Sequence, residues 1–100
     1  MPDFYISSVR YDSTGQHIEW VKTHKVTYNQ DKSSFDTAGS MNSRKFVTEL
    51  ISSGKVTFKT VVKKADGSYS EGEDVRIVRR YLTTDPNNTT KDNLGELPKF

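Results

Sequence analysis

The chain has 100 residues, a formal net charge of +2 and no cysteine, and 32 % of its residues are hydrophobic. This length is typical of one domain with a modest core, so we expect residues 1–100 to form a single domain. The lack of cysteine excludes disulfides, thiolate metal ligands and a cysteine nucleophile. The small charge does not by itself indicate nucleic acid or a membrane as partner. No apolar run approaches the ~20 residues of a membrane span and the start lacks the features of a signal peptide, so we expect a cytoplasmic protein.

The first part of the chain predicts a β-hairpin. Residues 3–12 and 17–28 show the alternation of strands, and Thr14–Gly15 between them suits a two-residue turn. This register makes two apolar pairs, Tyr11 with Ile18 and Val9 with Trp20. It leaves Ile6 and Val21 on the polar face, so either both faces are partly covered or a bulge near Ser7–Ser8 changes the alternation.

Residues 29–42 have no periodicity, and we expect them to form a long loop. Phe35 is the one large apolar residue in this stretch. Long loops in small domains are commonly functional or disordered. We therefore take Trp20, His24 and Phe35 as candidate contacts with a partner.

A short helix is predicted next. Asn42 is expected to be its N-cap, Met41 and Phe46 fit a hydrophobic staple, and Gly54 fits the position just after the helix. A stripe at helical spacing predicts the face that packs on a sheet: Phe46, Val47, Leu50 and Ile51.

The second half of the chain predicts another hairpin. Residues 55–64 form its first strand, Asp66–Gly67 its turn, and residues 74–84 a longer second strand. The register pairs Phe58 with Val75, Val56 with Ile77, Lys59 with Asp74 and Thr57 with Arg76. Residues 81–84 extend beyond this pairing, so we expect them to pair with the first hairpin. The predicted fold class is therefore α+β, with the order ββαββ, a mostly antiparallel sheet, one helix on one face and a docked C-terminal tail over 85–100.

Candidate catalytic residues are not evident. His17 and His24 are seven positions apart on one predicted strand, which places them on opposite faces and argues against a shared metal. Acyl transfer needs a nucleophile beside a base, and none of the serines has a fixed base partner in the sequence. We therefore expect no catalytic, metal or cofactor site, and a non-enzymatic interaction or accessory module with an unknown protein partner.

Nucleic-acid binding is the alternative. The second hairpin is rich in basic residues, and acidic residues in the same hairpin reduce their excess charge. The candidate contacts are Lys55, Lys63, Lys64, Arg76 and Arg80.

Motifs at both ends of the chain point to a family. They read I-S-S-V-R-Y over 6–11, R-Y-L-T-T-D over 80–85 and D-N-L-G-E-L-P over 92–98. Together with the helix and the Thr-containing strand between them, they resemble the bacterial family called domain of unknown function 3892, over nearly the whole chain. Family members often carry arginine after Y-L, where this chain has Thr83. The resemblance implies one autonomous bacterial domain and supplies no catalytic residues.

The tail is unusually apolar for a chain end, with Leu94, Leu97, Pro98 and Phe100. Asp92 is expected to cap a short helical turn that places both leucines on one side, and Pro98 to end it. We interpret Leu94, Leu97 and Pro98 as structural residues that close an open end of the core.

Deleting residues 92–100 should therefore lower the melting temperature by many degrees, because the two leucines would no longer cover the core. Thermal unfolding followed by circular dichroism measures this. An unchanged melting temperature would show that the tail is not docked.

Overall fold

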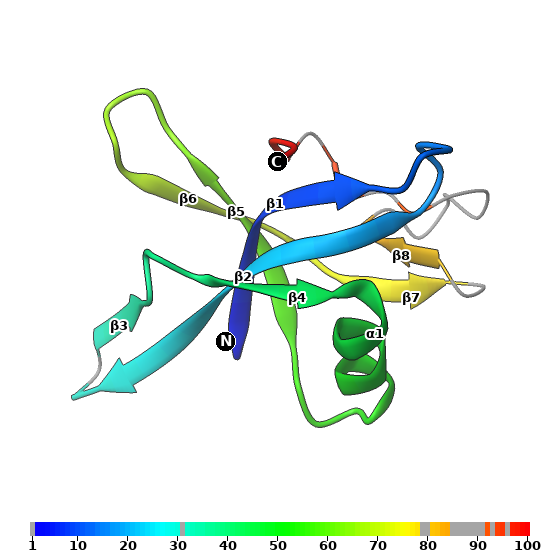
Figure 1. Cartoon of the computed structure of the whole chain (residues 1–100). Helices are drawn as coiled ribbons and strands as arrows, with labels where there is room; N and C mark the ends of the chain where they lie inside the picture. Colours follow the sequence, from blue (N-terminus) through cyan, green and yellow to red (C-terminus); the bar gives the residue numbers. More distant parts are fainter. Residues whose placement is uncertain (1, 31, 79–80, 85–91, 93, 96) are drawn as a thin grey trace.

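The computed structural model describes residues 2–30, 32–78, 81–84, 92, 94, 95 and 97–100. The elements in order are β1 Phe4–Tyr11, β2 Ile18–Asn29, β3 Lys32–Phe35, β4 Ser40–Ser43, α1 Arg44–Ser52, β5 Phe58–Lys63, β6 Tyr69–Asp74, β7 Arg76–Val78 and β8 Tyr81–Thr83. Six strands form a curled, mixed sheet in the order β3-β2-β1-β5-β6, with β4 also paired to β2. Strands β7 and β8 form a small second sheet near the helix (Figure 1). The described chain is thus mostly β with one helix, and its sheet resembles half a barrel.

Strand β1 is the centre of the large sheet. It pairs antiparallel with β2 and parallel with β5. The predicted pair of Tyr11 with Ile18 is confirmed. Of the two alternatives left open for this hairpin, the structure shows the bulge, between Ile6 and Ser8. The predicted pairing of Val9 with Trp20 is wrong, because a second irregularity beside Tyr11 shifts the register by one residue. Val9 pairs with Val21 instead, and both are buried.

The expected loop over 29–42 is largely strand, so that prediction is wrong. Strand β3 pairs with the distal end of β2, and β4 pairs with Trp20–Thr23 of the same strand. Both strands are short, polar and mostly exposed. Backbone pairing to the long β2 positions them, so they show no apolar alternation that the sequence could reveal.

The helix begins one residue later than predicted. Ser43, not Asn42, is the N-cap, and its Oγ accepts a hydrogen bond from the Phe46 backbone N–H at 3.1 Å. Val47 of the predicted stripe is fully buried, whereas Phe46 is 49 % exposed. Gly54 follows the C-cap with a φ of 75°, as expected for a residue that ends a helix.

The second hairpin is confirmed near Lys59, which pairs with Asp74. The continuous strand expected over 74–84 is wrong. The chain leaves the sheet at Val75, whose side chain is buried in the core, and β7 then pairs antiparallel with β8. Residues 81–83 therefore pair within the second sheet and not with the first hairpin.

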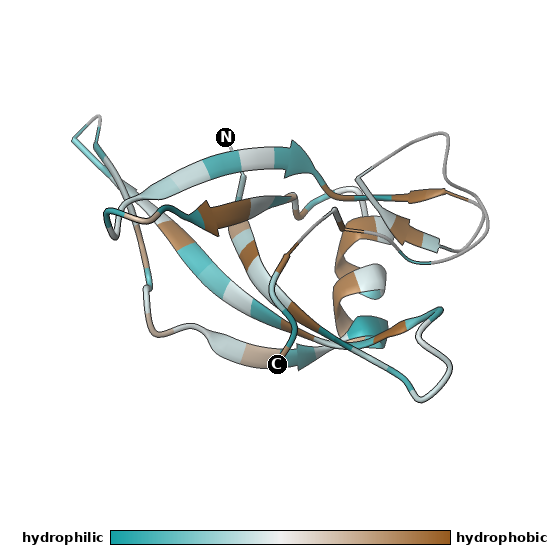
Figure 2. Ribbon diagram, turned by 90° about the horizontal axis from the view of Figure 1, so that it is seen from above, coloured by the Kyte–Doolittle hydropathy of each residue, from teal (hydrophilic) through white to brown (hydrophobic). Residues whose placement is uncertain are grey.

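One face of the large sheet carries the main core. Helix α1, strands β7 and β8 and the two tail leucines contribute to it, and hydrophobic colouring is prominent in these elements (Figure 2). Leu94 and Leu97 are buried, as predicted. Pro98 is exposed, and its carbonyl accepts a hydrogen bond from the Val9 N–H at 2.9 Å. The tail is thereby joined to β1 beyond the point where β5 stops pairing with it.

Asp92 is fully buried and connects separate parts of the fold. Its carboxylate accepts hydrogen bonds from the backbone N–H groups of Ile18 at 2.8 Å and Leu82 at 2.7 Å. The Arg44 guanidinium donates to both oxygens, from Nε at 2.7 Å and from Nη2 at 3.0 Å. The carboxylate thus makes hydrogen bonds to three segments that are distant from one another in the sequence. The helical turn predicted around it lies partly outside the described residues.

Replacing Asp92 by asparagine should destabilise the protein by about 3 kcal/mol. The amide carries no charge to pair with Arg44, and its NH2 group would face N–H groups that now donate to the carboxylate. In a domain of this size the melting temperature should fall by roughly 10 °C or more. Thermal unfolding measures the effect. The control is Asp74→Asn at an exposed carboxylate, and equal shifts in the two variants would contradict the role of Asp92.

Candidate functional site

The large sheet has a second face, opposite the core, and it curls around that face. Strands β3 and β6 stand at the two ends of the strand order, four positions apart. A flat sheet would hold them about 19 Å apart at the usual strand spacing. The ring centroids of Phe35 on β3 and Tyr69 on β6 are nevertheless only 5.0 Å apart, and the two rings meet edge to face. We call this concave side, which carries Tyr5, Lys22, His24, Phe35 and Tyr69, the inner face.

Strand β2 supplies a continuous row of side chains to the inner face. Its alternation is regular, so Trp20, Lys22, His24 and Val26 point to the same side. Phe35 is the cross-strand partner of Val26, and its ring lies 5.9 Å from that of His24. The structure thus brings His24 and Phe35 together, and it places Trp20 farther along the same face.

His24 is 3 % exposed and hydrogen-bonded through both ring nitrogens. Its Nδ1 lies 2.6 Å from the backbone oxygen of Asp36, and its Nε2 lies 2.7 Å from Ser7 Oγ. A carbonyl oxygen can only accept, so Nδ1 carries a proton, and in the neutral ring Nε2 accepts the Ser7 hydroxyl proton. The expectation that no serine has a base partner is therefore wrong for Ser7.

Two features of the backbone produce this contact. The bulge between Ile6 and Ser8 takes Ser7 out of the regular pairing with β2. On the other side, Gly39 packs against the imidazole so closely that an added Cβ would lie 2.7 Å from His24 Cε1. The sequence leaves the bulge open as one of two alternatives, and nothing in the sequence aligns it with His24.

Two adjoining cavities open on the inner face. One has a volume of about 240 Å³ and is lined by Ser7, Ser8, Lys22, His24, Thr37, Val62, Lys63, Tyr69 and Pro98. The other, of about 290 Å³, is lined by Ser8, Lys22, Gly39, Ser40, Met41 and Phe100. They share Ser8 and Lys22, and within the described part of the chain no aspartate or glutamate side chain lines either of them.

The charge on this face is positive. Among the described residues, neither Lys22 nor Lys63 forms an ion pair, and both are exposed at the cavities. Lys59, on the same side of the sheet, is instead neutralised by Glu71 at 3.0 Å and Asp74 at 3.8 Å. Lys22 and Lys63 therefore line the first cavity with no ion-pair partner among the described residues.

Tyr5 and Glu71 form a second polar contact on the inner face. The Tyr5 hydroxyl donates to Glu71 Oε2 at 2.6 Å. Burial, with a further contribution from this carboxylate, raises the pKa of Tyr5 to about 12. The hydrogen bond from Tyr5, followed by that from Lys59, lowers the pKa of the Glu71 carboxyl.

The residues predicted to contact nucleic acid lie on separate parts of the fold. Lys55 follows α1, Lys63 ends β5 at the inner face, Lys64 is in the β5–β6 connection and Arg76 begins β7. Arg80 lies outside the described residues. Lys63 and Lys64 are neighbours in the chain, whereas Lys55 and Arg76 lie in two other segments.

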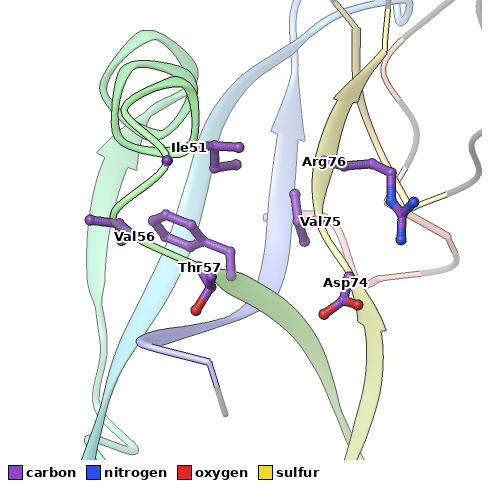
Figure 3. A pocket seen from close by; sticks show the side chains of 8 residues that line it. Ile51, Val56, Thr57, Asp74, Val75 and Arg76 are labelled. Atoms are coloured by element: carbon purple, nitrogen blue, oxygen red, sulfur yellow. The ribbon is translucent and has the colours of Figure 1, made fainter.

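A further pocket, of about 360 Å³, lies between the end of α1 and the start of β7 (Figure 3). Its wall is largely apolar, with Ile51, Val56 and Val75 among the lining residues. Asp74 and Arg76 line it with opposite charges, and the Arg76 side chain extends away from Ile51. The described residues of this pocket bring together no excess charge and no nucleophile beside a base, so the inner face is the stronger candidate site.

The part of the chain that the structure describes contains no cluster of three or more histidine, aspartate or glutamate residues arranged to hold a metal ion. The helix there is too short and too polar to span a membrane.

Comparison with known proteins gives one match. The family model described as "Protein of unknown function (DUF3892)" matches residues 5–98. No curated protein and no solved structure matches the chain.

Replacing Glu71 by glutamine should lower the free energy of unfolding at about pH 7 by no more than about 1 kcal/mol, because the ion pair of Glu71 with Lys59 is partly exposed. The melting temperature should therefore fall only slightly. A carboxyl with a lowered pKa stabilises the fold above its unfolded pKa, and this contribution is lost as the pH falls through the folded value. The difference in free energy of unfolding between the native protein and Glu71→Gln should therefore become smaller toward about pH 3. The control is Glu73→Gln, and a difference independent of pH in Glu71→Gln would contradict the assignment.

Proposed function

The chain belongs to the DUF3892 family of proteins of unknown function, and we propose that it is a binding module whose inner face takes an acidic segment of a protein partner. The observation that carries the proposal is the pair of lysines, Lys22 and Lys63, at adjoining cavities that no carboxylate side chain of the described residues lines. Electrostatic complementarity of this kind selects anionic partners and speeds their association.

The surroundings of the lysines favour a peptide segment over a lone anion. Met41 and Phe100 line the second cavity and are 53 % and 39 % exposed. Methionine adapts to irregular apolar partners, and aromatic rings are common anchors at interfaces. A segment that places a carboxylate near Lys22 and an apolar side chain near Met41 would satisfy both parts of this surface.

Hydroxyl groups add directional contacts. Ser8 lies between the two cavities, Thr37 lines the first and Ser40 lines the second. Hydroxyls can donate to a carboxylate or accept from a backbone N–H, so they suit a peptide that presents both. The partner would therefore be recognised by charge, one apolar anchor and backbone polarity together.

Trp20 provides a direct test, because it is the only tryptophan and points to the same side as Lys22. A synthetic peptide with two glutamates flanking a leucine should change its fluorescence on binding. The double variant Lys22→Glu with Lys63→Glu should bind this peptide at least about tenfold more weakly, because each change places like charges together.

The matched control is Lys45→Glu with Lys55→Glu, which changes the net charge equally at exposed positions outside the two cavities. It should bind within about twofold of the native chain. Equal loss in both variants would show that only net charge matters and would overturn the proposal. Tighter binding of a single-stranded oligonucleotide than of the peptide, lost steeply with salt, would favour nucleic acid instead.

A further inference from the structure

Ser7 and His24 have the geometry of a nucleophile and its general base. Such sites need the two groups within hydrogen-bond reach and a third group that orients the base. Here Ser7 Oγ lies 2.7 Å from His24 Nε2, and the backbone oxygen of Asp36 holds Nδ1 at 2.6 Å. The orienting carbonyl fixes the tautomer in which Nε2 is free to take a proton.

The pair is also held rigidly. His24 is almost fully buried, and Gly39 and the Phe35 ring pack against its imidazole. Ser7 is positioned by the bulge in the central strand of the sheet. A catalytic pair gains from such fixed geometry, because the reacting groups need no reorganisation.

Ser7 and His24 both line the cavity of about 240 Å³, so the pair borders space that a small molecule can enter. Lys22 and Lys63 line the same cavity. Positive charge near the nucleophile would stabilise the oxyanion that develops when a carbonyl is attacked. A purely structural hydrogen bond would explain the buried ring, but it does not require an open cavity on the hydroxyl side.

We propose that Ser7 is a nucleophile toward small acyl esters and that His24 is its general base. In the first step Ser7 Oγ forms a bond to the ester carbonyl carbon while its proton moves to His24 Nε2. The bond from that carbon to the leaving oxygen then breaks, and the leaving group takes the proton from Nε2. Water next transfers a proton to Nε2 while its oxygen forms a bond to the acyl carbon. The bond from that carbon to Ser7 Oγ then breaks, Oγ takes the proton from Nε2, and the acid leaves.

This chemistry depends on Ser7 and His24 and not on recognition of an acidic segment. A neutral ester therefore tests it separately from the proposed binding function. The size of the cavity favours a small acyl group, and p-nitrophenyl acetate is a suitable probe because its acetyl group is small and its leaving group is coloured.

Incubation with p-nitrophenyl acetate should acetylate the native chain at Ser7, as shown by intact mass and peptide mapping. The release of p-nitrophenolate should exceed that of Ser7→Ala by at least about tenfold, since a positioned base contributes about 10²-fold or more. Ser33→Ala is the control, because Ser33 is exposed on β3 and lines neither cavity, and it should react within about twofold of the native chain. Equal release from the native chain and Ser7→Ala, or acetylation elsewhere only, would overturn the proposal.

A second measurement does not depend on the ester. The chain has no cysteine, so Ser7→Cys and Ser33→Cys each introduce a single thiol. A thiol beside His24 should be alkylated by iodoacetamide at least about tenfold faster than the thiol at position 33, because the base increases its thiolate fraction. Equal rates in two folded variants would show that His24 does not act as a base toward position 7.

Discussion

The buried carboxylate of Asp92 is the constraint on which the arrangement of the chain depends. It accepts hydrogen bonds from the start of β2, from β8 and from Arg44 at the start of α1, and it belongs to the tail itself. A charge in the core is tolerated only when its hydrogen-bonding capacity is met, so these four segments must meet at one point. The leucines that follow Asp92 then cover the core, and the contacts of Pro98 and Phe100 with Val9 extend this attachment along β1.

The one helix of the described residues contributes to the core, and the sheet curls around its opposite face. The long strands bring their distal ends together, and Phe35 contacts Tyr5 and Tyr69 across the resulting concavity. The lysines and hydroxyls beside these rings remain accessible because the apolar elements are used on the other face. The two faces of the sheet therefore differ. The face toward the helix carries the core that stabilises the fold, and the other face is a polar, positively charged concave surface.

The sequence predicts those elements in which buried apolar residues recur at regular spacing or in which a turn has its typical residues. The first hairpin, the helix, the Asp66–Gly67 turn and the burial of Leu94 and Leu97 follow from alternation, helical spacing or turn chemistry. Strands β3 and β4 could not be predicted in this way, because backbone pairing to β2 positions them and their side chains are mostly polar. The parallel pairing of β1 with β5 and the departure of the chain at Val75 depend on contacts between distant segments. The Ser7–His24 contact combines a bulge, which is one of two alternatives from the sequence, with a register that single-strand patterns cannot supply.

The central claim is that the inner face is where this protein meets its partner. Amide NMR of the labelled chain, titrated with the glutamate and leucine peptide, tests it residue by residue. The account predicts that the largest shifts fall on Ser8, Lys22, Thr37 and Tyr69, with little change at Ile51, Val56 and Arg76. Shifts concentrated on the latter group, at the pocket of Figure 3, would contradict the claim, as would the absence of any shift at low salt.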